Sequence, residues 1–430
     1  MAVLSVFSAS FKAVRFAKLK MSAVSLANER VEIIHNMPYD SLATEHGTIY
    51  PPGDILDSEV VELNEQKLSI ETSIKYVDDD YDGNALGTIV GKPVDIYPYD
   101  YKQASVKIYK YGTSTLLANL STDIAAKASE TPGNSGIIYL CVIDSANQPV
   151  PQAQVIISNS TLSPVLSINT TTDDSGCIMV PALPPDEHNN YHIEVTKDGY
   201  STDMTYPRTP QNPNEIQPNI NVIAQQVSRV TLSIDKKSTF KLKAQDLNGL
   251  PVPNLSLRIH GAKEIYFNPS TYKYDQNVNC DANGETILLD MEWDNYTISV
   301  LTPGFYVSST TPTIPLYLAP DSILEGIIYI TNSASAPQIT SITPLKAVVG
   351  DLTSISVSGA NFDNTATIQI INSTTGTIIN GVDVTVSAHK TITADFQLPV
   401  DSVGLWNIKV INVNAEYAEQ KNGIEIVSGS

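Results

Sequence analysis

This sequence has few cysteines, a deficit of cations and no long apolar run. Only 3 of its 430 residues are cysteine, which excludes a disulfide-rich scaffold and a multi-cysteine metal site. Lys and Arg number 26 against 46 for Asp and Glu, so the formal net charge is −20. A surface this acidic is not expected to bind nucleic acid or to spread over an anionic membrane. The first residues are too few for a membrane span, which takes about 20 apolar residues, and their cations follow the apolar residues instead of preceding them as in a signal peptide.

Signatures of catalysis are also missing. The sequence contains no Gly-x-Ser-x-Gly elbow, no phosphate-binding loop and no His-Glu-x-x-His pair. Its 6 histidines are scattered, and only His188 and His192 fall four residues apart, in a turn rich in Pro and Asn. We therefore predict that the protein is not an enzyme.

Two interpretations of the cysteines are open. An odd, low count favours three isolated thiols on strands and turns. The alternative is one disulfide between Cys141 and Cys177, because both fall in the same predicted domain.

Strand-forming and turn-forming residues dominate what the sequence does contain. Hydrophobic residues make up 42% of the chain, and it has 22 Gly and 26 Pro. This composition provides enough apolar material for packed cores and is typical of β-sandwiches with many turns. A chain of 430 residues predicts three to four domains. The expected fold class is mainly β with one long N-terminal α-helix and β-sandwich domains in a row.

Residues 1–37 have the spacing of one long helix, because apolar residues recur at intervals of three, four and seven. The predicted apolar face consists of Leu4, Phe7, Phe11, Val14, Met21, Val24, Val31 and Ile34. Nothing interrupts the pattern before Met37-Pro38, where the residue preceding proline leaves the α region. Such a helix would be roughly 55 Å long. One small domain cannot bury a helix of this length, so we predict that it packs against partner helices or in a filament core. The alternative is a shorter helix that lies on its own domain.

The end of this helix carries a family resemblance. Residues 26–44, LANERVEIIHNMPYDSLAT, are followed by three alternating segments at 67–80, 101–110 and 116–123. This order resembles the N-terminal region of type IV pilin-like proteins and pseudopilins. The resemblance implies that residues 38–133 form a pilin-like β head and that the helix packs against other pilin-type subunits. In those proteins a leader and an apolar segment precede the part that matches Met1 to Phe16, so we expect a membrane anchor only if such a segment lies upstream of Met1.

The middle of the chain repeats one unit with a period near 100 residues. Residues 134–228, which include a Pro-rich and Asn-rich linker, contain the turn Asp173-Asp-Ser-Gly176, and residues 229–334 contain Asp281-Ala-Asn-Gly284. The glycines supply the positive φ that tight turns between strands require. Both units resemble carboxypeptidase regulatory-like domains, which implies two transthyretin-like β-sandwiches.

Residues 335–430 form the last predicted domain. Ser341-Ile-Thr-Pro344 followed by Gly359-Ala-Asn-Phe362 resembles a TIG-type immunoglobulin-like domain. The alternation predicts four inward-facing residues, Ile355, Val357, Ile368 and Ile370. Trp406 is expected to be a core aromatic and not a ligand platform.

One acidic segment has the spacing of a calcium loop. Asp78, Asp80, Asp82 and Gly83 occupy loop positions one, three, five and six, and Asn84 follows. Ile89 stands where the loop would place its chelating Glu, so Asp95 or Asp100 would have to replace that ligand. The segment therefore predicts a Ca²⁺ site formed by Asp78, Asp80, Asp82 and Asn84; the alternative is a solvated acidic turn. We predict no other cofactor.

Two functions remain open at this point. The first is a non-enzymatic surface protein, a minor or tip subunit of a type IV pilus or pseudopilus in the cell envelope, which displays its β-domains for adhesion or assembly. Its expected partners are other pilin-type subunits and a host or surface glycan or protein. The second is an extracellular module that binds a carbohydrate or another ligand, for which exposed aromatic side chains are needed; the local cluster to consider is Tyr97, Tyr99, Tyr101, Tyr109 and Tyr111.

Overall fold

The computed structural model describes residues 2–63, 66–79, 81–95, 99–126 and 134–429, and the side chains of 2–9 are not described. The fold is mainly β with one N-terminal helix and several β-sandwich-like sheets in series, as the sequence predicts. Two compact units divide the chain: Met1–Asp198 with Thr202–Ile234, and Gly199–Ser201 with Asp235–Ser430.

Helix α1 (Ala2–His35) forms because no Gly or Pro interrupts 34 residues of helical spacing. Its last turn closes when the amide of Asn36 donates to the carbonyl of Glu32, and Pro38 then excludes further helix. A single 3₁₀ turn, η1 (Tyr39–Ser41), follows. In the part of the chain that the structure describes, no helix is long and apolar enough to span a bilayer.

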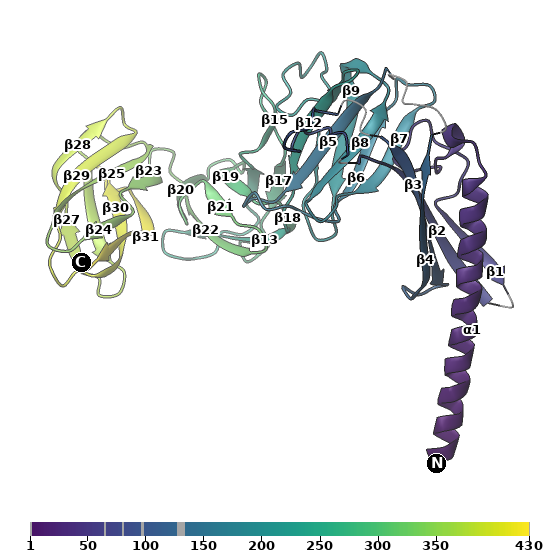
Figure 1. Cartoon of the computed structure of the whole chain (residues 1–430). Helices are drawn as coiled ribbons and strands as arrows, with labels where there is room; N and C mark the ends of the chain where they lie inside the picture. Colours follow the sequence, from purple (N-terminus) through teal and green to yellow (C-terminus); the bar gives the residue numbers. More distant parts are fainter. Residues whose placement is uncertain (1, 64–65, 80, 96–98, 127–133, 430) are drawn as a thin grey trace. The chain divides into compact units, whose positions relative to one another are not determined.

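The first unit begins with an antiparallel sheet that packs on α1 (Figure 1). Its strands, in spatial order, are β1 (Ser58–Leu63), β2 (Gln66–Val77), β3 (Tyr101–Lys110) and β4 (Leu116–Ala125). Alternate residues of β2 and β3 are buried, so one face of the sheet covers the helix. We call the sheet of β1 to β4 the head. The core between it and the helix contains Ala23, Leu26, Ala27 and Ile34 of α1 and Leu68, Ile70, Val106 and Ile108 of the sheet.

The first sandwich completes this unit. Its strands are β5 (Gly136–Ile143), β6 (Gln154–Asn159), β7 (Leu166–Thr171), β8 (Cys177–Leu183), β9 (Asp186–Thr196), β10 (Asp203–Met204), β11 (Ile220–Val222) and β12 (Val227–Ser233). One sheet has the order β12-β5-β8 and the other β10-β9-β6-β7, with β11 also on β9. Because β12 runs parallel to β5 along seven residue pairs, the sandwich extends through Ser233. The predicted linker therefore ends inside the sandwich, where β11 joins a sheet.

The second unit begins with another two-sheet sandwich. Its strands are β13 (Ser238–Asp246), β14 (Ser256–His260), β15 (Glu264–Tyr266), β16 (Thr271–Tyr272), β17 (Asp275–Asn279), β18 (Glu285–Met291), β19 (Asp294–Val300), β20 (Tyr306–Thr311), β21 (Leu316–Leu318) and β22 (Ile323–Thr331). The main sheets are β18-β13-β22-β20 and β17-β14-β19-β21. As in the first sandwich, the first strand pairs in parallel with the last, here β13 with β22.

A third sandwich ends the chain. Its strands are β23 (Gln338–Thr343), β24 (Lys346–Val348), β25 (Leu352–Ala360), β26 (Thr367–Asn372), β27 (Ile378–Asn380), β28 (Val382–Ser387), β29 (Thr391–Gln397), β30 (Gly404–Ile411) and β31 (Tyr417–Val427). All four residues predicted to face inward lie in its core. Trp406 is 2% exposed and donates its indole N–H to the carbonyl of Ser402, so the prediction of a core aromatic is confirmed.

Candidate assembly surface

Helix α1 packs on the head with one face and leaves another face open. Ala23 and Ala27 are fully buried and Leu26 is 5% exposed, because these small and aliphatic residues meet the sheet. On other faces Phe11 is 65% exposed, Val14 64% and Met21 73%. Three large apolar side chains are thus exposed on one helix, which makes this face a candidate surface for the predicted partner.

The predicted apolar face is therefore divided between two environments. Phe11, Val14, Met21 and Val24 are exposed, but Ile34 is 4% exposed in the core of the head and Val31 packs against that core. The sheet covers only the side of the helix that carries Ile34 and Val31, and the assembly role of the predicted face stays a prediction. The side chains of Leu4 and Phe7 lie outside the described residues.

A buried lysine fixes the end of the helix to the head. The ammonium of Lys102 donates hydrogen bonds of 2.9 Å to the carbonyls of Tyr39 and Leu42, and it lies 4.7 Å from the ring centre of Tyr39 and 5.3 Å from that of Tyr76. Burial lowers the pKa of Lys102 to about 8. Sequence reasoning missed this residue, although its position in β3, in phase with buried Ala104, was a usable signal.

The acidic loop does not present a calcium cage among the described residues. Asp78 accepts a hydrogen bond from the amide of Ala85, and the side chain of Asn84 exchanges two hydrogen bonds with Thr88. Asp80 lies outside the described residues. No group of three His, Cys, Asp or Glu side chains in the described ranges is placed to hold a metal ion. The calcium site stays a prediction, and a Ca²⁺ titration of the full chain that gives neither heat nor a shift in melting temperature would end it.

The tyrosine cluster does not form one platform in the described residues. Tyr101 and Tyr109 stand at opposite ends of β3, eight residues or about 26 Å apart. Tyr99 is half-buried against Tyr76, with ring centres 5.5 Å apart, and only Tyr111 is largely exposed. Tyr97 lies outside the described residues. This arrangement gives no support to the carbohydrate-binding alternative.

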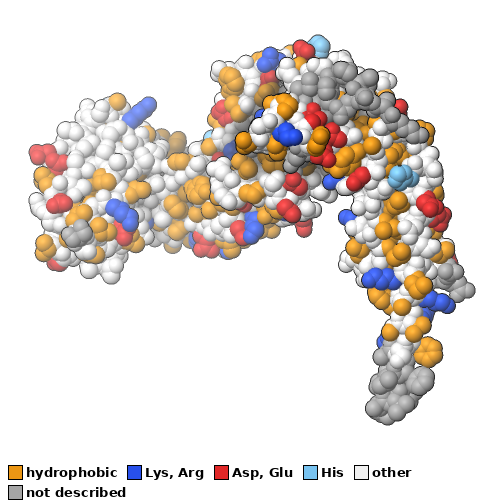
Figure 2. Space-filling model, in the orientation of Figure 1, with side chains coloured by type: hydrophobic (Ala, Val, Ile, Leu, Met, Phe, Trp, Pro, Cys, Tyr) orange, Lys and Arg blue, Asp and Glu red, His pale blue; other side chains and the backbone are white. Residues whose placement is uncertain are grey.

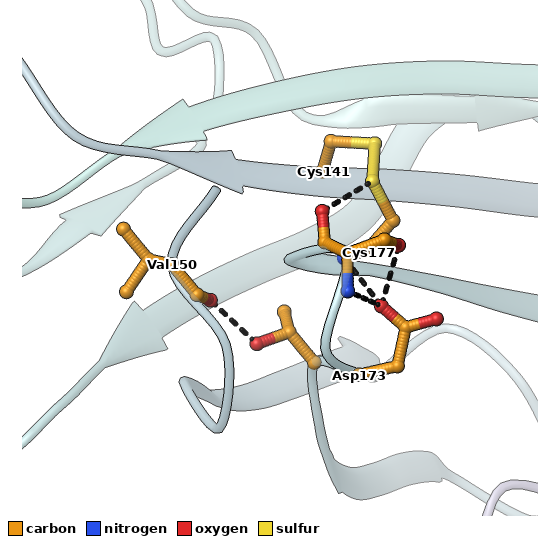
Figure 3. Close-up of a disulfide and its surroundings, with 6 residues drawn as sticks. Cys141, Val150, Asp173 and Cys177 are labelled. Carbon is orange, nitrogen blue, oxygen red and sulfur yellow. Dashed lines mark hydrogen bonds between the residues drawn. A yellow bond between two sulfur atoms is a disulfide. The ribbon is translucent and has the colours of Figure 1, made fainter. Parts of the chain in front are cut away.

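A disulfide joins two neighbouring strands of the first sandwich (Figure 3). Cys141 of β5 and Cys177 of β8 are direct register partners, with Cα atoms 4.1 Å apart. The expectation of three isolated thiols was wrong, because strand pairing brings residues 36 positions apart side by side. Cys280 remains free and buried in the second unit, and burial raises the pKa of its thiol to about 11.

The turn before Cys177 recurs in the second sandwich. The carboxylate of Asp173 accepts hydrogen bonds from the amides of Ser175 and Cys177 (Figure 3). In the same way the carboxylate of Asp281 accepts from the amides of Asn283 and Glu285. Each turn then places a glycine at φ +73°. These are the contacts expected of a repeated unit.

Residues 137–235 match the family model of the carboxypeptidase regulatory-like domain. The first sandwich is therefore similar to that domain. This match confirms one of the two predicted copies, and its limits agree with the strands β5 to β12. Membership of the second sandwich in that family, the TIG-type domain and the type IV pilin-like N-terminus stay predictions.

No curated protein matches the sequence. Solved structures that resemble the chain include the Bacillus anthracis TIE protein, at 16% identity over 76% of this chain and 58% of that one, with a TM-score of 0.20. Others are a streptococcal ancillary pilin (11% identity, 53% and 75% covered, TM-score 0.22) and BcpA, the major pilin subunit of Bacillus cereus (10%, 69% and 98%, TM-score 0.18). The chain thus spans less than two thirds of the TIE protein. TM-scores this low carry no argument about function.

Proposed function

We propose that this chain is a non-enzymatic structural protein of the cell surface, a minor or tip subunit of a pilus-like fibre of the type IV or pseudopilus kind. Helix α1 is its assembly element, and the three sandwiches are the parts that it displays. The observation that carries this proposal is the exposure of Phe11, Val14 and Met21 on a helix whose other face already holds its own head.

The energetics of the helix favour a partner. The stability of a helix in a protein comes mostly from packing of its apolar face, and an isolated helix of about 12–15 residues is marginal in water. The turns before Leu19 have little packing against the head, since the core residues of α1 begin there. Burying one large apolar side chain contributes about 1.5–3 kcal/mol, so several exposed residues per copy favour association against its entropic cost.

The disulfide supports a place outside the reducing cytoplasm. Stable disulfides form and persist mainly in oxidising compartments such as the cell surface. Cys141 and Cys177 lie on adjacent strands of a domain that would be on display in the proposed fibre. A minor subunit fits better than a bulk one, because several appended domains would crowd the surface of a filament.

The test is self-association of the full chain, measured by sedimentation over a range of protein concentrations. The variant Phe11→Gln/Val14→Gln/Met21→Gln keeps a residue of good helix propensity at each position while removing the apolar contact. The matched control Leu250→Gln/Val400→Gln/Val413→Gln changes three side chains of the second unit that are 63%, 80% and 72% exposed. We expect the helix variant to stay monomeric at concentrations where the wild type and the control associate. Equal association of all three proteins would refute the assignment.

A further inference from the structure

Cations gather at one end of the head. A groove of about 640 Å³ is lined there by Lys12 and Arg15 of α1, by Lys67 and Lys110 of the sheet, and by Phe16 and Tyr111. No carboxylate lines this cationic groove among the described residues. Lys18 and Lys20 are exposed on the neighbouring helical turns. Figure 2 shows Lys and Arg side chains on the helix beside its apolar ones.

These cations lie together in a chain with a net charge of −20. Several cations elsewhere form ion pairs: Arg30 with Glu59, Arg258 with Asp275 and Lys346 with Glu425, at 3.0, 2.6 and 2.8 Å. Within the described ranges, none of the cations that line the groove has a carboxylate within 4.0 Å. Glu62 is the cross-strand register partner of Lys67, so one carboxylate stands beside the groove. A group of like charges with so few carboxylates near it favours an acidic partner.

The opposite end of the same head is acidic. A groove of about 760 Å³ lies where α1 meets β4, and its lining includes Asp40 and Asp123. Glu29 and Glu32 are exposed on the helical turns that lead to it. Lys102 interacts with Asp40, but its ammonium is buried and donates to the carbonyls of Tyr39 and Leu42, so it is not presented to a partner.

The separation between the cationic and the acidic groove is about the same along the helix as along the sheet. From Arg15 to His35 the helix rises about 30 Å. Lys110 and Tyr101 stand at opposite ends of β3, and the latter pairs with Ala125 beside the acidic groove, so the strand spans about 30 Å as well. Helix and sheet therefore present the same charge pattern, positive at one end and negative at the other.

We propose that the cationic groove binds the acidic groove of a second copy of this chain, with the two helices parallel and displaced by about 30 Å. This inference rests on the proposed function and specifies its geometry. Copies in register would place like charges together, which opposes association. The displaced contact joins two different surfaces, so a pair of copies leaves one groove unoccupied at each end, where a further subunit of the fibre can bind.

Charge reversal tests the contact in the full chain. The variant Lys12→Glu/Arg15→Glu/Lys110→Glu turns the cationic end acidic, and Glu29→Lys/Glu32→Lys/Asp123→Lys turns the acidic end cationic. Each variant alone then carries two ends of the same sign, and we expect its association to weaken at least tenfold, roughly the loss of two to three surface ion pairs. Mixing the two variants pairs unlike ends again, and we expect association to return. Loss of folding cannot produce that recovery.

The control reverses three cations of the second unit, Lys241→Glu/Lys346→Glu/Lys390→Glu, and changes the net charge equally. We expect it to associate as the wild type does. Association of the wild type should also weaken at about 1 M salt, where the Debye length falls to about 3 Å.

Several results would overturn the inference. The contact between the grooves would be refuted if the charge-reversal variants associate like the wild type, or if mixing them does not restore association. The substitutions of Phe11, Val14 and Met21 test the proposed function separately. A closed dimer would show antiparallel pairing instead of a displaced parallel one. Binding of the wild type to phosphatidylglycerol vesicles without self-association would assign the cationic groove to a membrane surface.

Discussion

Lys102 provides the sharpest quantitative prediction, because its burial has a calculable effect on stability. The substitution is Lys102→Met, which keeps the length of the side chain and removes the ammonium. Two effects oppose each other at about pH 7: the charge no longer has to be buried, but the carbonyl of Leu42 loses its donor at a cost of about 1–3 kcal/mol. We therefore expect a change in the free energy of unfolding of less than about 2 kcal/mol at that pH.

The pH dependence separates the two proteins more clearly. Burial lowers the pKa of Lys102 to about 8 from its ordinary value of 10.5. Because the folded pKa is the lower one, the unfolded chain holds more protons between these values, and the stability of the wild type rises with pH. From about pH 7 to about pH 9.5 this gain is about 2 kcal/mol. Lys102→Met lacks the gain.

The assay is urea unfolding of both proteins followed by circular dichroism in the helical band. That signal reports the first unit, since α1 is the single α-helix of the described residues. Burial also raises the pKa of Tyr76, but this acts from about pH 10 upward and is shared by both proteins. Lys107→Met, an exposed position of the same strand, is the control and should follow the wild type. If the free energy of unfolding changes with pH equally in the wild type and in Lys102→Met, the claim that the buried ammonium of Lys102 controls this pH dependence is refuted.

Three further predictions concern the sandwiches. Cys141→Ser/Cys177→Ser should lower the free energy of unfolding of the first unit by about 4 kcal/mol, the loop-closure value for a separation of 36 residues, and melting with and without reductant checks it. Gly176→Ala and Gly284→Ala should each cost roughly 3 kcal/mol or more, because a Cβ would meet the carbonyls of Val142 and Ala244 at 2.8 and 2.5 Å; Gly304→Ala, at φ +80° with open space, should cost about 1–2 kcal/mol in the same urea titration. Cys280 should resist alkylation at about pH 8 until the second unit unfolds, because burial raises the pKa of its thiol to about 11; fast labelling of the native chain by mass spectrometry would contradict this.

Local patterns determined much of the fold. The helix ends within two residues of the predicted position, because Pro38 stops it in both the pattern and the structure. Alternation located β2, β3 and β4, and the two Asp-x-x-Gly turns fixed where strands reverse. Strand β1 was missed, and nothing in the alternation showed that β12 returns to pair with β5, since parallel pairing depends on distant residues.

The candidate surface was only partly predictable. The helical period groups apolar residues but does not say which face meets the chain's own sheet, so Ile34 and Phe11 looked equivalent. The cationic groove was invisible for a related reason: Lys12 and Arg15 lie far in sequence from Lys67 and Lys110, and only the fold brings them together. The pairing of Cys141 with Cys177 likewise depended on strand register.

Hydrogen exchange of the full chain in dilute and in concentrated solution tests the central claim most directly, because it locates the contact between copies. The account predicts that the amides of residues 10–24 become protected as the protein associates, with further protection near Lys110 and Asp123, while the second unit is unchanged. Protection confined to the sandwiches, with residues 10–24 exchanging equally fast in both samples, would contradict the assignment of α1 as the assembly element.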